Sequence, residues 1–376
     1  MSPLPDPFAV TERGVTEARP AHAALRAAGP LVRIDAPAGG SAWLVTEDAL
    51  ARQVLTDPRL AKDPALAPEA WSRIGLEPTA AEQTSMTTAD GPVHAGLRRA
   101  HAPLFSARGM GEHYDRMTAI ARELLTEVAD GEVDLAVDFA TRFPVTAICD
   151  LLGVRDYGER ASAACRAMFT ADAGPAFGTF MELATVALTE RGDNLATALR
   201  DRLPDGTSEN DLRYCVFLIV FAGQITMDSS LGFLVAHLLH ERPDLPDRRA
   251  LDAYVQQNLR LHPPAPYTLW RFTTEEVELA GQTLAAHSPV LVDLAGITLD
   301  PDRPEGPDLV FGAGPHFCVG AQLAQLLLRA VADVLTHDFP AARLAVPFEQ
   351  LRQRDFGGTQ GSHLTALPVR LRPDGV

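Results

Sequence analysis

One stretch, residues 311–320, restricts the fold of this chain more than any other part of its sequence. It reads FGAGPHFCVG and leads into a helix, predicted over about residues 320–336, that is apolar on most of its surface. Glycine permits backbone turns that other residues resist, so a tight loop is expected. This loop brings Cys318 to the helix start, where unpaired N–H groups and the positive end of the helix dipole favour a thiolate.

The other three cysteines stand in different surroundings. Cys149 and Cys215 lie in apolar helical stretches and are expected, together with Cys165, to be small buried hydrophobic residues. The four cysteines are far apart in the sequence and form no CxxC pair. The sequence therefore indicates neither a zinc site nor a disulfide scaffold.

The charge and hydropathy of the chain bear on its partners. The 376 residues carry a formal net charge of −16 and contain no block of Lys and Arg, so neither nucleic acid nor a membrane surface is an expected partner. The N-terminus lacks a basic start followed by an apolar run. The most apolar segment, residues 214–223, is shorter than the roughly 20 residues that span a bilayer. We therefore expect a cytoplasmic protein.

Helical patterns dominate the sequence, and strand-like runs gather toward its two ends. Helices are expected over residues 46–55 (capped by Thr46), most of 92–153, 208–242, 252–261 and 320–336. Strands are expected over residues 31–35, 42–46, 277–279, 290–294 and 364–371. No series of βαβ units is indicated. The expected fold class is α+β, mainly α, with residues 1–376 forming a single domain.

Phe311, Gly314, Cys318 and Gly320 follow the order FxxGxxxCxG, which resembles the haem-ligand signature of the cytochrome P450 family. A structural cysteine after a glycine-rich loop would not require this combination. The resemblance implies that Cys318 binds the iron of haem b, that Phe311 packs behind the sulfur and that Gly320 leaves room beside the macrocycle. A thiolate pushes electron density onto iron and favours O–O cleavage. The family fold places a helix-rich part and smaller β-rich regions around a buried haem.

A second segment, residues 90–99 (DGPVHAGLRR), is similar to the family helix that meets the haem propionates. His94 and Arg98 are four residues apart and share one helical face, where two cationic donors suit a pair of carboxylates. By the same resemblance, Arg271 and His316 also bind the propionates. Each residue alone would be an ordinary surface charge, but the four match the family pattern in register.

The sequence AGQIT at residues 222–226 looks like the oxygen-binding segment of the family, in which an Ala/Gly–Gly pair precedes an acid and a threonine. Thr226 matches the threonine that hydrogen-bonds the bound oxygen. Ile225, however, stands where the family has the acid that relays protons. Asp228, three residues further on, and Gln224 are candidates to replace that acid, and Asp228 has a solvated or capping role as its alternative.

The family motif ExxR reads Gln257-Asn258-Leu259-Arg260 in this chain. Gln257 can accept a hydrogen bond from Arg260, but it lacks the charge assistance that roughly doubles the strength of such bonds. The segment between residues 294 and 311 is shorter than in the family, and Arg303 is a candidate third member of this structural cluster. We expect the fold to persist with weaker haem retention.

The resemblance also predicts a mostly apolar substrate pocket. Its expected residues come from the long helix and from the segment after Pro263-Pro264: Leu218, Phe221, Ala222, Tyr267 and Leu269. Plain core packing is the alternative for each of them. An apolar lining suits a hydrophobic small molecule or an aromatic group.

The predicted function is a monooxygenase that tailors a natural product in bacterial secondary metabolism, with electrons from a ferredoxin-type partner. Two alternatives remain at this level. The missing acid at Ile225 favours a peroxide-driven enzyme or one that couples, cyclises or isomerises its substrate without net oxygen transfer. The altered ExxR motif favours a non-enzymatic helper of a glycosyltransferase, but the retained Cys318 and propionate residues argue against this.

Overall fold

The long helix predicted over residues 208–242 is the central element of the fold. The computed structural model describes residues 4–71, 77–167, 174–190, 192–357 and 360–373. In it, α10 (Glu209–Glu241) begins at the cap Ser208, whose hydroxyl accepts the N–H of Asp211, and ends at Arg242 in the left-handed conformation. By length and composition α10 is apolar enough to cross a membrane, yet most of its apolar stretch is buried inside the protein. A helix that is apolar on all sides is expected to be buried in this way.

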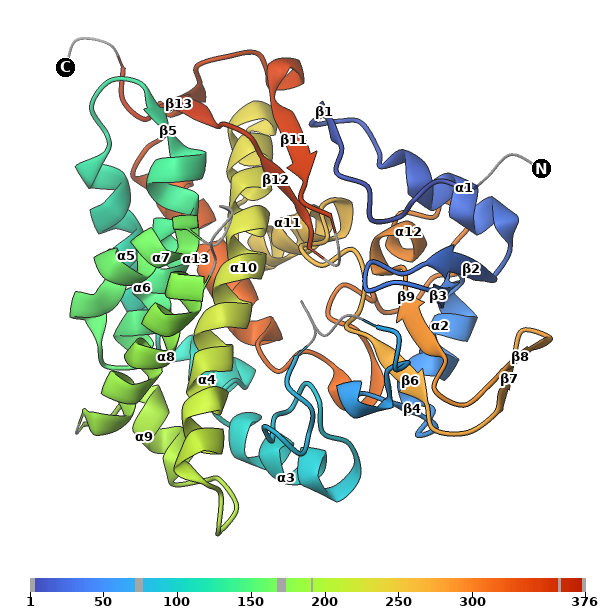
Figure 1. The fold of residues 1–376 in the computed structure, drawn as a ribbon. Helices are drawn as coiled ribbons and strands as arrows, with labels where there is room; N and C mark the ends of the chain where they lie inside the picture. The colour runs from blue at the N-terminus through green and yellow to red at the C-terminus, as the bar shows by residue number, and fades with distance from the viewer. Residues whose placement is uncertain (1–3, 72–76, 168–173, 191, 358–359, 374–376) are drawn as a thin grey trace.

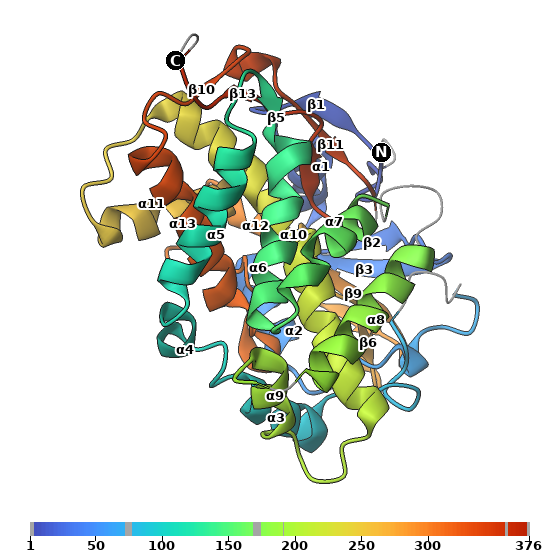
Figure 2. The same ribbon diagram turned by 90° about the vertical axis from the view of Figure 1, so that its left-hand side faces the viewer.

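Helices pack along one side of α10, and the β-rich part of the chain lies on its other side (Figure 1). The view turned by 90° shows α5, α6 and α8 in front of α10 (Figure 2). The further helices are α1 (Pro20–Ala28), α2 (Asp48–Thr56), α3 (Gly91–His101), α4 (Ala107–Gly111), α5 (Tyr114–Glu127), α6 (Arg142–Leu151), α7 (Gly158–Ala167), α8 (Gly174–Thr189), α9 (Leu195–Arg200), α11 (Arg248–Leu261), α12 (Leu294–Thr298) and α13 (Ala321–His337). A π-helical turn (Ala136–Ala140) precedes α6.

The largest sheet has five strands in the order β2-β3-β9-β6-β4. They are β2 (Leu31–Asp35), β3 (Ser41–Val45), β9 (Pro289–Val292), β6 (Arg271–Thr273) and β4 (Leu60–Ala61). Its neighbouring strands are antiparallel except β3 and β9. The smaller sheets contain β1 (Glu12–Gly14), β11 (Arg352–Asp355) and β12 (Ser362–Leu364); β10 (Arg343–Leu344), β13 (Pro368–Arg370) and β5 (Val133–Asp134); and β7 (Val277–Leu279) with β8 (Gln282–Leu284).

The buried apolar side chains form one large cluster in the helical part and two smaller clusters around the five-stranded sheet. The large cluster surrounds α10 and includes residues of α5, α6 and α13. One small cluster joins α2 to β9, and the other joins α1 to β2 and β3. The fold is therefore α+β with helices dominant, as the sequence predicts.

Three local predictions differ from the structure. Thr46 does not cap α2, because its hydroxyl donates to the carbonyl of Gly29, and Glu47 occupies the cap position. The final strand predicted over residues 364–371 is two short strands, β12 and β13, in different sheets. The helix predicted from residue 252 begins earlier, at Arg248, because Asp247 caps it by accepting the N–H of Ala250.

Candidate active site

The cysteine loop has the tight geometry that its glycines require. Gly312 and Gly314 have φ of 72° and 70°, in the left-handed region that favours glycine. At Gly314 a Cβ would also lie 2.8 Å from the carbonyl oxygen of Leu55 at the end of α2. The loop closes with a hydrogen bond of 2.9 Å from the N–H of Cys318 to the carbonyl of Phe311. Glycine at 314 is therefore needed both for the turn and for the contact with α2.

Cys318 differs from the other three cysteines in its exposure. It is exposed, whereas Cys149, Cys165 and Cys215 are buried, as predicted. Burial raises the pKa of the Cys318 thiol, although the N–H of Gly320 and the guanidinium of Arg98 act in the opposite direction. The helix-end argument for a free thiolate is thus outweighed by desolvation. A metal ion reverses this balance, because it deprotonates the thiol that binds it.

Four predicted propionate ligands gather beside this loop. Arg98 of α3 donates to the carbonyl oxygen of Phe317, and the rings of His94 and His316 lie 4.0 Å apart. Arg271 of β6 is buried and donates to the carbonyl of Leu60 at 3.1 Å. Within the described part of the chain, no hydrogen-bond partner faces its buried Nε.

Lys62 and Asp90 join the cluster that His94, Arg98, Arg271 and His316 form, although the sequence does not predict them as ligands. Lys62 adds a cation, and Asp90 adds a carboxylate. Asp90 Oδ1 lies 2.9 Å from His316 Nε2, and Asp90 Oδ2 accepts the backbone N–H of Lys62 at 2.7 Å. Lys62 is buried, and burial, followed by repulsion from Arg271, lowers its pKa to about 7. Lys62 follows a two-residue strand and carries no motif, so only its position in the fold identifies it.

The charges of this cluster fit the haem. Burial lowers the pKa of His94 to about 4 and lowers that of His316, and the neighbouring cations lower both further. A dianionic ligand would relieve this repulsion and satisfy the unpaired Nε of Arg271. The two propionates of a haem ligated by Cys318 are such a ligand, so the residues present fit the group that the sequence predicts.

Replacing Arg271 with methionine is expected to weaken haem binding by roughly 10- to 100-fold, because a charge-assisted contact to a propionate is lost. Competition with apomyoglobin for haem measures this change. Arg33→Met, on the exposed side of β2 in the same sheet, is the control. Equal haem affinity in the two variants would show that Arg271 does not contact the haem.

The small pair on α10 has two separate roles. Ala222 is exposed within an otherwise mostly buried helix, and α10 packs against α13, the helix that begins after Cys318. A Cβ at Gly223 would lie 2.7 Å from Cδ1 of Ile148, so Gly223 permits the approach of α6 and not of the haem. The Thr226 hydroxyl donates to the Ala222 carbonyl at 2.9 Å.

Gln224 and Asp228 do not join Thr226. Both contact Thr141, the residue before α6. Gln224 Nε2 donates to the carbonyl of Thr141 at 3.0 Å, and the hydroxyl of Thr141 donates to Asp228 Oδ2 at 2.9 Å. Gln224 Oε1 is buried and has no partner among the described residues. Burial raises the pKa of Asp228 to about 6, while the bond from Thr141 lowers it. The two predicted substitutes for the missing acid thus lie on the α6 side of α10.

The pair Gln257 and Arg260 is arranged differently from the prediction. Gln257 is exposed, and the partner of Arg260 Nε is Asp308 Oδ1 at 3.2 Å. Arg303 Nη1 also contacts Asp308 Oδ1, at 3.1 Å, as expected for the third member of the cluster. The carboxylate in this cluster therefore comes from Asp308.

The predicted pocket residues differ in how much of each side chain is exposed. Leu218 and Phe221 are partly buried, and Ala222 and Leu269 are exposed, with 43% of Leu269 accessible. Tyr267 is 1% exposed and belongs to the core beside β2 and β3. The prediction for Tyr267 is corrected accordingly.

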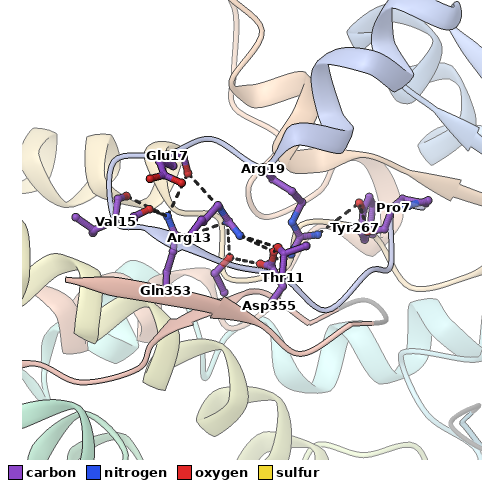
Figure 3. Close-up of polar contacts among 11 residues, drawn as sticks. Pro7, Thr11, Arg13, Val15, Glu17, Arg19, Tyr267, Gln353 and Asp355 are labelled. Carbon is purple, nitrogen blue, oxygen red and sulfur yellow. Dashed lines mark hydrogen bonds and ion pairs between the residues drawn. The ribbon is translucent and has the colours of Figure 1, made fainter. Parts of the chain in front are cut away.

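Figure 3 shows why Tyr267 is held away from the pocket. Its hydroxyl donates to the carbonyl of Pro7 at 2.9 Å, and the guanidinium of Arg19 lies above its ring. Arg19 and Arg13 both bind Asp355 of β11, at 2.6 and 2.5 Å. Tyr267 thus belongs to a polar cluster that ties the N-terminal segment to β11, a contact between distant parts of the sequence that no local pattern indicates.

No protein-family model matches this sequence. The chain is 41% identical to "Cytochrome P-450 monooxygenase DoxA" of Streptomyces peucetius subsp. caesius, over 98% of both chains. The chain belongs to the cytochrome P450 family. This P450 is also 31% identical to "Cytochrome P450 monooxygenase PikC" of Streptomyces venezuelae, over 98% of this chain and 95% of that one. Its fold matches the tirandamycin C-bound P450 monooxygenase TamI with a TM-score of 0.79 and 30% identity, over 93% and 96% of the two chains.

These comparisons confirm the predicted family, fold and enzyme class. The protein is a cytochrome P450 monooxygenase, and haem iron is the cofactor that its family implies. P450 monooxygenases of this family bind small-molecule substrates, as the TamI complex illustrates.

Proposed function

We propose that this P450 inserts an oxygen atom into a small, mostly apolar natural-product intermediate, with haem b bound through Cys318 and electrons from a ferredoxin-type partner in the cytoplasm. The exposed Cys318 in a loop beside Arg98, His94 and His316 carries this proposal, and the exposed side chains of Ala222 and Leu269 add apolar surface that suits an apolar substrate. The relatives support it: one is named a vitamin D(3) 25-hydroxylase, and another a mycinamicin IV hydroxylase/epoxidase. Residues 1–376 act as one catalytic unit.

Each group of residues has a distinct task in this proposal. When bound, the haem supplies an iron centre that activates dioxygen. Cys318 holds the iron and donates electron density through its sulfur. Arg98, Arg271 and Lys62 would offset the charge of the propionates, and His94 and His316 would donate hydrogen bonds to them. Gly314 allows the tight turn of the loop, and Gly320 would leave room beside the macrocycle. Thr226 is partly buried on α10, and its hydroxyl donates to the Ala222 carbonyl; in this proposal that hydroxyl would turn from the carbonyl to hold a proton for the reaction.

An exposed arginine on α3 supports the proposal of a redox partner. Arg99 follows Arg98 on α3, and Arg98 contacts the loop through Phe317. A local positive charge on a chain of net charge −16 attracts an acidic protein without making the whole surface basic. We propose that a ferredoxin-type protein approaches this face.

The test of this function uses the purified protein reconstituted with haem. The reduced CO complex is expected to show the strongly red-shifted Soret band of a thiolate haem. Apolar natural products, with tirandamycin C among them, are expected to shift the resting spectrum and to gain one oxygen atom when NADPH, ferredoxin and its reductase are supplied. A protein that gains no Soret band with haem would contradict the proposal and favour the non-enzymatic helper.

A second candidate function follows from the position of the acids. Ile225 replaces the family acid, and Asp228 is engaged with Thr141 on the α6 side of α10. A peroxide-driven or non-oxygenating enzyme would not need that acid. Product formation with hydrogen peroxide that exceeds the NADPH-supported rate would favour this second function.

Thr226→Ala is expected to reduce NADPH-supported product formation by roughly 100-fold, because a positioned proton donor contributes about that much. Ser230→Ala is the matched control, since its hydroxyl also donates to a carbonyl of α10, that of Thr226. Product formed per NADPH consumed is measured for both variants. Unchanged coupling in Thr226→Ala would remove Thr226 from proton delivery.

A further inference from the structure

Residues 303–308, which precede the cysteine loop, are attached to α2 and α11 through the side chains of Arg303 and Asp308. Arg303 has a side chain only 6% exposed, and its Nε contacts Asp48 Oδ2 of α2 at 2.8 Å. Its Nη2 donates to the carbonyl of Pro307 at 2.5 Å. Arg52 of α2 donates to the same carbonyl, also at 2.5 Å. Residues 303–308 are therefore bound to α2 through both side chains and backbone.

Asp308 links this attachment to α11. Its Oδ1 lies 3.1 Å from Arg303 Nη1 and 3.2 Å from Arg260 Nε. One carboxylate oxygen thus bridges two guanidinium groups from different parts of the chain. Gln257, one turn before Arg260, is exposed and is not part of this bridge.

We infer that Asp308 is a positioning residue for Cys318 and supplies the carboxylate that this P450 lacks at position 257. Only Leu309 and Val310 separate Asp308 from Phe311, whose carbonyl accepts the N–H of Cys318. The middle of the loop contacts α2 at Gly314, where a Cβ would lie 2.8 Å from the carbonyl oxygen of Leu55. The carboxylate therefore fixes the near end of the loop to α11 and α2, while Gly314 fixes its middle to α2.

The charges explain why the carboxylate is needed. Arg52, Arg260 and Arg303 bring three positive charges together, and Asp48 and Asp308 supply two negative ones. Without the charge at 308, Arg260 loses its carboxylate partner. Arg303 then keeps the carboxylate of Asp48 and loses that of Asp308. The bond from Arg303 to Asp308 is a charge-assisted hydrogen bond, about twice as strong as a neutral one, and the contact with Arg260 is an ion pair. An amide at 308 weakens the first and removes the second, so it holds the loop less firmly.

The experiment compares Asp308→Asn, Gln257→Glu, the double variant and the control Glu305→Gln, which removes an exposed carboxylate from the same segment. Each holoprotein is assayed for the rate of haem transfer to apomyoglobin and for the fraction of red-shifted CO complex. Asp308→Asn is expected to transfer haem about 10-fold faster and to lose part of the red-shifted band, because weaker attachment of the loop loosens the sulfur. The control is expected to match the parent.

Rescue distinguishes positioning from general stability. The carboxylate introduced by Gln257→Glu would lie one turn from Arg260 on the same helical face, so the double variant is expected to recover the parent transfer rate and band. Gln257→Glu alone is expected to slow transfer, a result that does not depend on how well Asp308→Asn folds. An Asp308→Asn variant that behaves like the control, or a double variant without recovery, would overturn the inference.

This inference rests on haem binding at Cys318, and the two can fail separately. A parent protein that binds no haem contradicts the proposed function. A parent that binds haem normally, beside an Asp308→Asn variant equal to Glu305→Gln, contradicts only the role of Asp308.

Discussion

Cys318→Ala is expected to abolish the red-shifted Soret band of the reduced CO complex and to lower turnover by more than about 1000-fold, the scale seen when a central catalytic group is removed. The sulfur is the ligand that pushes electron density onto the iron, and a methyl group can neither bind the metal nor donate charge. The fold should survive, because the residue is exposed and its removal leaves no cavity in the apolar core.

Cys215→Ala is the matched control for this prediction. Cys215 is buried in α10, where it packs as a small hydrophobic residue. Its loss is expected to cost stability on the order of 1 kcal/mol and to leave the spectrum unchanged. A Cys318→Ala variant with the parent spectrum and turnover would refute the assignment of the haem ligand.

The parts of the site that the sequence predicts are those that local sequence determines. The cysteine loop follows from glycines at fixed offsets before an apolar helix, and His94 and Arg98 share a face because they are four residues apart. The helix expected over residues 208–242 is present as α10, and Ser208 caps its start. These features need no information about distant segments.

The parts that the sequence does not predict depend on tertiary contacts. Tyr267 is buried because Pro7 and Arg19 lie against it, and both belong to the N-terminal segment. Asp308 replaces a glutamate of α11 only because the shortened segment passes beside Arg260. The pKa of Cys318 is another case, because burial of the thiol raises it and outweighs the groups that favour the thiolate.

The placement of Gln224 and Asp228 was partly accessible from the sequence. They are four residues apart and therefore share a helical face, which differs from the face of Thr226. What the sequence could not supply is the partner on that face, Thr141, which follows a π-helical turn.

Asp228→Asn is expected to stabilise the protein at pH 8 by about 1–3 kcal/mol. Burial raises the pKa of Asp228 from 3.8 to about 6, so the folded protein binds this proton more tightly than the unfolded chain does. The stability of the fold therefore falls as the pH rises from about 4 to 6, and the full cost of the buried charge, about 3 kcal/mol, is present above pH 6. Asparagine carries no charge and avoids this cost.

The surroundings of Asp228 accommodate the amide. Its oxygen can accept the Thr141 hydroxyl, as the carboxylate does, and its NH₂ group can donate to the unpartnered Oε1 of Gln224. Cys165, the other titratable group beside Asp228, remains a neutral thiol, because burial raises its pKa. The gain in stability should therefore disappear below about pH 4, where the carboxyl is protonated in both the folded protein and the unfolded chain.

Chemical denaturation of Asp228→Asn and the parent at pH 4, 6 and 8 measures this difference. Thr141→Val, which removes the hydrogen bond to the carboxylate, is expected to have the opposite effect and to be most destabilising at pH 8. A free energy of unfolding that is equal for Asp228→Asn and the parent at every pH would show that the carboxylate is not buried as a charge.

The same variant decides how protons reach the site. If Asp228 replaces the acid missing at Ile225, the stabilised Asp228→Asn protein should lose roughly 100-fold of its NADPH-supported turnover, because a neutral amide cannot relay a proton. If the reaction is driven by peroxide, turnover should persist. An Asp228→Asn variant that is more stable but less active would identify Asp228 as a buried charge retained for catalysis. A variant that is more stable and fully active would leave Thr226 and the substrate to deliver the proton.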